Sequence, residues 1–141
     1  MKASFTFNRT INAPIEKVFD AFTDHRGYAR MTPLRSSTLE REGEPAPNGV
    51  GAVRKLALAG PPIVEEVVGY ERPTYFAYKA LKGLPVKEHL GEVRLRDVGG
   101  ATEMTYTVAY TASVPRTEPV VGAVLRQAVG ALARGIAKSV E

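Results

Sequence analysis

The last quarter of the chain carries the clearest hydrophobic pattern. Apolar side chains in residues 117–141 recur at three- and four-residue spacing, and at about 100° per residue they form one stripe. The stripe consists of Val121, Leu125, Ala128, Val129, Leu132, Ile136 and Val140. The opposite side carries Arg126, Gln127, Arg134 and Lys138. The pattern predicts a long amphipathic helix, capped by Thr117, whose stripe packs against the rest of the protein.

The N-terminal part alternates between apolar and polar positions and then changes period. Residues 2–12 alternate as a half-buried strand does. Pro14 suits the first position of a helix, and apolar residues at helical spacing predict a helix over 14–23. A second, shorter helix is expected over 24–31. It ends before Pro33, because the residue before proline resists the α conformation.

From residue 36 the apolar positions recur every second residue, which predicts a series of strands. We expect strands at 36–43, 50–58, 62–71, 74–81, 86–97 and 101–112. The breaks between them hold glycine, proline or both, as turns require. This spacing is typical of neighbouring antiparallel strands. The length of 141 residues fits one domain, 1–141.

Composition narrows the class of protein. The hydrophobic fraction is 44%, enough for a core. No run approaches the ~18 apolar residues of a membrane span, and residues 1–5 (MKASF) lack the apolar core of a signal peptide. We therefore expect a cytoplasmic protein without a transmembrane segment. The absence of cysteine excludes disulfides, thiolate catalysis and zinc–thiolate sites.

The charge pattern argues against a nucleic-acid partner, although the net charge is +4. Basic residues are interleaved with acidic ones, as at 40–42 (ERE), and no aromatic residues alternate with a basic run. The two histidines, His25 and His89, lack metal-ligand spacing. Gly49 and Gly51 precede a strand rather than a helix, so they form no phosphate loop. We expect no metal site and no cofactor.

Four short motifs, in order along the chain, resemble those of one family. They are residues 11–19 (INAPIEKVF), 49–54 (GVGAVR), 65–68 (EEVV) followed by 71–73 (ERP), and 99–104 (GGATEM). Together with the order of elements they resemble the START/Bet v 1-like (SRPBCC) superfamily, and within it the polyketide cyclase/dehydrase and lipid-transport group. The resemblance covers essentially the whole chain.

This resemblance implies an α+β helix-grip fold. In that fold a curved antiparallel sheet of about seven strands, in the order β-α-α-β6-α, wraps around a long C-terminal helix. The family includes lipid carriers, aromatic polyketide cyclases, hormone receptors and chaperone cofactors, so the fold does not specify an activity. The chaperone-activating branch usually carries tryptophan, which this chain lacks.

Strand alternation selects candidate residues for a cavity between the helix and the sheet. In 101–112 one face, expected to point to the helix, carries Met104, Tyr106, Val108 and Tyr110. In 86–97 the same parity turns His89 inward. Either face of 74–81 can point inward. The candidate ligand-binding residues are Tyr78, His89, Met104, Tyr106, Val108, Tyr110, Val121, Leu125, Ala128 and Leu132.

The polar candidates each have two interpretations. His89 is the tentative catalytic residue, because histidine exchanges protons near neutral pH, or it is structural. The tyrosine hydroxyls either orient a ligand or reach the rim from the core. Arg54 either points inward, where it forms an ion pair with Glu65 or Glu66 or anchors a ligand carboxylate, or it forms an ion pair on the outer face. The pair formed by residues 24 and 25 (DH) is expected to be a solvated turn.

Three functions remain open at this point. The first is binding or transport of a small hydrophobic molecule, such as a lipid, an isoprenoid or an aromatic polyketide, in the expected cavity. The second is a cyclase or dehydratase that uses the same cavity. The third is a protein-interaction module with a filled core. The protein is expected to be a monomer or a homodimer, and transient contact with a membrane surface is compatible with the sequence.

Overall fold

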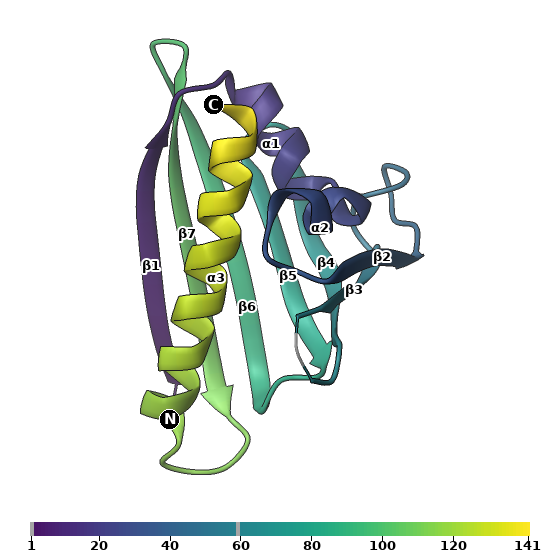
Figure 1. The fold of residues 1–141 in the computed structure, drawn as a ribbon, viewed down its shortest axis with the longest axis vertical. Coiled ribbons are helices and arrows are strands. Elements are labelled where there is room, and N and C mark those ends of the chain that lie inside the picture. Colours follow the sequence, from purple (N-terminus) through teal and green to yellow (C-terminus); the bar gives the residue numbers. More distant parts are fainter. Residues whose placement is uncertain (1, 59) are drawn as a thin grey trace.

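A computed structural model describes residues 2–58 and 60–141 as one curved antiparallel sheet with helices on one face (Figure 1). The seven strands lie in the order β1-β7-β6-β5-β4-β3-β2. They are β1 (Lys2–Ile11), β2 (Ser36–Arg41), β3 (Val53–Ala57), β4 (Ile63–Glu71), β5 (Tyr75–Lys82), β6 (Val86–Val98) and β7 (Ala101–Ala112). The helices are α1 (Ile15–Thr23), the 3-10 helix η1 (His25–Gly27), α2 (Tyr28–Met31) and α3 (Glu118–Val140).

This architecture is the expected α+β helix-grip fold, and the strands lie close to their predicted positions. Two differences concern short segments. The helix expected over 24–31 is divided into η1 and α2. Thr117 does not cap α3 with its side chain: its hydroxyl donates to the carbonyl of Val114, and only its backbone carbonyl accepts from the helix.

The first strand pairs with the last one, which the local pattern did not predict. β1 and β7 run antiparallel over ten residue pairs, from Lys2 opposite Thr111 to Ile11 opposite Thr102. At the end of the chain, the carboxylate of Glu141 accepts from the backbone N–H of Asn12 at 3.3 Å. These contacts place α3 over β1 and β7, as Figure 1 shows.

The apolar stripe of α3 packs into the concave face of the sheet, but not evenly. Five of its seven members are buried, whereas Ala128 and Leu132 remain half-buried. Gly135 lies against the backbone of Met31, where a Cβ atom would clash with the carbonyl oxygen. The helix therefore makes close contact at α2 and leaves space farther toward its N-terminus.

By length and composition, α3 is also the one helix in the described ranges that would qualify as a membrane span. The same length and composition fit the core helix of a folded protein. Here its buried residues, from Val121 to Val140, belong to the hydrophobic core that contains the inward side chains of the sheet.

Candidate functional site

A cavity of about 330 Å³ lies between the middle of α3 and the sheet. Its apolar walls come from α3 and from strands β3 and β4, with Leu34 and Leu84 contributed by two loops. The helix supplies Val124, Leu125, Ala128, Val129, Ala131 and Leu132, and the strands and the segment after β3 supply Leu56, Leu58 and Ile63. Leu58 and Val124 are 48% and 64% exposed, so they mark the mouth of the cavity. Both half-buried members of the α3 stripe, Ala128 and Leu132, line this space, together with the buried Leu125 and Val129.

Four polar side chains also line the cavity: Arg54, Glu65, Tyr78 and His89. Arg54 on β3 lies opposite Glu65 on β4 in the register of the sheet. The guanidinium Nη2 and Nε atoms are 2.7 and 2.9 Å from the same carboxylate oxygen, Glu65 Oε1. Both residues are buried, 1% and 6% exposed, so this ion pair is largely removed from water. Arg54 therefore points inward with Glu65 as its partner, which decides between the two interpretations of the sequence.

Aromatic rings surround the guanidinium of Arg54. Its Cζ lies 4.7 Å from the ring centroid of Tyr28, 4.6 Å from Tyr78 and 5.6 Å from Phe76. Rings at these distances attract a cation through their negative faces, and the effect grows as water is removed. Phe76 and Tyr78 thus point inward from β5, which settles the orientation of this strand.

His25 completes the surroundings of Arg54 and corrects one expectation. It is fully buried rather than part of a solvated turn. Its Nδ1 lies 3.3 Å from Arg54 Nη1, and its Nε2 lies 3.0 Å from the carbonyl oxygen of Asn48. Because arginine only donates, Nδ1 must accept and Nε2 must carry the proton. Burial and the neighbouring cation of Arg54 lower the pKa of His25 to about 3, so the ring is neutral.

Tyr78 links the cavity to the core. Its hydroxyl lies 2.5 Å from that of Tyr106, and burial raises the pKa of both groups, so both are protonated at neutral pH. The ring of Tyr78 rests on Gly91 of β6, where a Cβ atom would overlap it. A glycine at this position lets the ring lie flat on the sheet.

His89 lies on the inward face of β6, as predicted. Its Nδ1 accepts a hydrogen bond from the backbone N–H of Ala80 at 3.0 Å, and its ring centroid is 5.6 Å from that of Tyr78. Burial lowers the pKa of His89 below its ordinary value. The ring is therefore neutral at physiological pH, which does not favour the proton exchange considered for it.

The ten candidate residues divide into two groups. Tyr78, His89, Leu125, Ala128 and Leu132 line the cavity. Met104, Tyr106, Val108, Tyr110 and Val121 are buried in the core and do not line it. The hydroxyl of Tyr110 instead donates to the carbonyl of Glu118 at 2.9 Å, beside the first turn of α3. Strand parity finds the inward face correctly but does not say which part of that face borders empty space.

Arg54 and Glu65 were not among the ten candidate ligand-binding residues, although both line the cavity. Their signal was present in the sequence: Arg54 shares strand parity with Ala52 and Leu56, both of which are buried. A charged residue within such an apolar face indicates a buried pair when an acidic residue faces it on the next strand.

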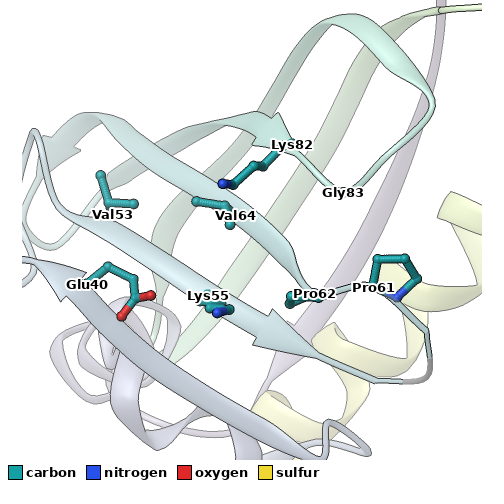
Figure 2. A pocket seen from close by; sticks show the side chains of 8 residues that line it. All are labelled: Glu40, Val53, Lys55, Pro61, Pro62, Val64, Lys82 and Gly83. Carbon is teal, nitrogen blue, oxygen red and sulfur yellow. The ribbon is translucent and has the colours of Figure 1, made fainter.

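The outer face of the sheet has a shallow depression of about 530 Å³, which Figure 2 shows. Val53, Lys55 and Val64 alternate with the inward residues Arg54 and Glu65, so they point away from the helix. Glu40 and Lys82 complete its charged rim. The charged side chains of this depression are exposed to solvent. The inner cavity, which is apolar and covered by two layers, is the better ligand site.

No group of three or more histidine, cysteine, aspartate or glutamate side chains able to hold a metal occurs within residues 2–58 and 60–141. Separately, the apolar walls and four polar side chains of the inner cavity suit binding and orientation of an organic molecule.

Comparisons with known proteins agree with this architecture. The chain is similar to the Zhui aromatase/cyclase from a Streptomyces species, with 18% identity, a TM-score of 0.82, and coverage of 99% of this chain and 94% of that chain. It is similar to a START superfamily protein from Mycobacterium smegmatis, with 12% identity, a TM-score of 0.82, and coverage of 97% and 96%. It is also similar to Ara h 8.0201, with 16% identity, a TM-score of 0.79, and coverage of 99% and 98%. At these identities the likeness shows the fold.

Among curated protein sequences, none matches the chain significantly. A sequence model of the family described as "Polyketide cyclase / dehydrase and lipid transport" matches residues 2–141. The chain therefore belongs to the polyketide cyclase/dehydrase and lipid-transport family.

Proposed function

We propose that this protein binds a small, mainly apolar molecule in the cavity between α3 and the sheet. The observation that carries the proposal is the composition of the cavity: apolar walls, with four polar side chains contributed by β3 to β6. Ligand sites typically combine apolar lining with a few polar groups that set orientation. Burial of the ligand's apolar surface supplies the driving force, at roughly 25 cal/mol per Å².

The size of the cavity narrows the class of ligand. Its volume of about 330 Å³ lies at the lower end of the ~300–1,000 Å³ that is usual for ligand pockets. Of the classes considered from the sequence, this space favours a compact aromatic or isoprenoid molecule over a lipid with long acyl chains. The exposed Leu58 and Val124 at the mouth leave a route for the ligand.

Native mass spectrometry of the protein purified from its own host tests this proposal. A retained ligand appears as added mass that is released on unfolding. Ala128→Trp places a large ring in the cavity and is expected to abolish the added mass. Ala123→Trp adds the same ring on the exposed side of α3 and is expected to retain it. Equal retention by both variants would place the ligand elsewhere.

A second candidate is a cyclase or dehydratase that uses the same cavity. It is favoured by the four polar groups within one apolar space and by the family to which the chain belongs. Catalysis would come mainly from holding a flexible substrate in a folded, reactive conformation. Product formation from linear polyketide substrates, and its loss in His89→Ala, would support the enzyme. Binding without any product would support the carrier.

The third possibility, a protein-interaction module, requires a core without a ligand cavity. The space between α3 and the sheet does not favour it.

A further inference from the structure

Strands β5 and β6 separate next to the cavity, and His89 lies at the point of separation. Their pairing extends from Tyr75 opposite Arg94 to Tyr78 opposite Gly91 and goes no farther in the described register. β6 continues alongside β7, with His89 opposite Tyr110. Because the pairing ends before Ala80, its backbone N–H does not bond to the backbone of β6. It donates instead to His89 Nδ1 at 3.0 Å.

This hydrogen bond determines which ring nitrogen of His89 carries the proton. A nitrogen that accepts from an N–H cannot itself be protonated, so Nδ1 is bare and the neutral ring bears its hydrogen on Nε2. Burial disfavours the doubly protonated ring by lowering its pKa. No side chain or backbone group in the described part of the chain pairs with Nε2, and the ring lines the cavity.

On the other side of Ala80 lies an acceptor. Glu65 of β4 is opposite Ala80 in the sheet, so Glu65 and His89 flank the same residue of β5. Arg54 binds Glu65 through Oε1 only. Glu65 Oε2 has no hydrogen-bond partner among the described residues, and Glu65 lines the cavity. The backbones of β4 and β6 are two strand spacings apart, roughly 10 Å.

We propose that these two atoms orient the ligand: His89 Nε2–H donates to a carbonyl-type oxygen, and Glu65 Oε2 accepts from a hydroxyl or amine group. This inference rests on the proposed binding function. Because Arg54 already neutralises the charge of Glu65, the site suits a ligand without net charge. His89 then acts as a binding residue with a fixed donor, not as a proton-accepting base.

Four naphthalene probes separate the two contacts: 2-acetyl-6-hydroxynaphthalene, 2-acetylnaphthalene, 2-naphthol and 2-ethylnaphthalene. The first probe carries both an acetyl carbonyl and a hydroxyl group. The second carries only the carbonyl, the third only the hydroxyl, and the fourth neither. Dissociation constants are measured by isothermal titration with the full chain. The acetyl group is expected to strengthen binding about threefold to tenfold over the ethyl group, the range for one hydrogen bond.

Two variants of His89 provide the matched comparison. Asparagine can still accept from the N–H of Ala80 but places no donor at the position of Nε2. His89→Asn is therefore expected to bring the acetyl-to-ethyl ratio close to one, while the gain from the hydroxyl group is unchanged. His89→Gln restores an N–H near that position and is expected to recover part of the ratio. The probes differ in their solvation in water, but this difference is the same for every protein. It therefore cancels when the acetyl-to-ethyl ratio of a variant is compared with that of the wild type.

A readout independent of ligands is the tautomer of His89, measured from long-range nitrogen–proton couplings in the NMR spectrum. The inference requires the Nε2–H form. Observation of the Nδ1–H form, or an acetyl-to-ethyl ratio that is the same in His89→Asn and the wild type, would overturn it and leave the binding function intact. Failure of all four probes to bind would overturn the proposed cavity function, and this inference with it.

Discussion

Arg54 holds a single oxygen of Glu65 with two of its nitrogens, at 2.7 and 2.9 Å, inside the core of the protein. Removing one partner leaves a buried charge without compensation. Glu65→Leu is therefore expected to lower the free energy of unfolding by about 3–5 kcal/mol. Replacing both, in Arg54→Met/Glu65→Leu, should recover most of that loss, because apolar side chains then fill the space. Urea denaturation of the three proteins measures the difference.

An exposed ion pair serves as the control for this prediction. Arg96 and Glu103 form a bridge of 3.0 Å on adjacent strands, with side chains 69% and 45% exposed. Water screens such a pair, so Glu103→Leu is expected to leave the melting temperature close to that of the wild type. A similar loss in Glu65→Leu and Glu103→Leu would contradict the importance of burial.

Gly91 provides the surface on which the ring of Tyr78 rests. Gly91→Ala introduces a methyl group into the space of that ring and is expected to destabilise the protein by about 1–3 kcal/mol, as overpacking does. The loss should be smaller when the alanine is introduced into a Tyr78→Leu background, because the clashing atoms are absent. A double-mutant cycle by thermal denaturation measures this coupling. Zero coupling would show that the cost of Gly91→Ala arises elsewhere.

His25 makes stability depend on pH on the acidic side of neutrality. Its pKa is about 3 in the folded protein, whereas a histidine in the unfolded chain titrates near 6.5. The unfolded state therefore takes up the proton first. The stability contributed by His25 is present above pH ~6.5 and falls as the pH drops toward 3, by about 2 kcal/mol between pH 7 and pH 5. His89, whose pKa is also lowered, acts in the same direction.

The variant His25→Gln isolates this effect. It removes the titrating group, so the slope of unfolding free energy against pH should become shallower between pH 7 and pH 5. Its stability at pH 7 should be lower, because glutamine does not reproduce both hydrogen bonds of the ring. An unchanged slope would mean that the pKa of His25 is the same in the folded and the unfolded protein.

Gly135 in α3 is expected to resist replacement by alanine. Helix propensity alone favours alanine by up to about 1 kcal/mol. A Cβ atom at this position, however, would clash with the carbonyl oxygen of Met31, which is backbone and cannot easily move. Gly135→Ala should therefore lower the melting temperature.

Gly130→Ala is the matched control on the same helix. Its added methyl would lie 3.2 Å from the tip of the Phe7 ring, a half-buried side chain that can shift. The variant Gly130→Ala should consequently lose less stability than Gly135→Ala. The reverse order would show that α3 does not rest on α2 as described.

The sequence by itself predicted the elements and the fold, because both depend on local pattern. The apolar stripe of residues 121–140 specifies a helix with one buried face. Alternation in 86–97 and 101–112 specifies the inward faces of β6 and β7, including that of His89. Glycine and proline mark the turns between strands. Four short motifs then supplied the family.

Only the tertiary structure decided which inward residues meet a cavity. Tyr106 and Tyr78 point to the same side of the sheet, yet only Tyr78 borders the space beneath α3. Tyr106 lies on β7, which α3 contacts closely, whereas Tyr78 lies two strands away on β5. The partners of Arg54 and the tautomer of His89 depend on contacts between residues of different secondary-structure elements. Side-chain periodicity carries information about faces, whereas cavities and hydrogen-bond partners arise from how separate elements pack together.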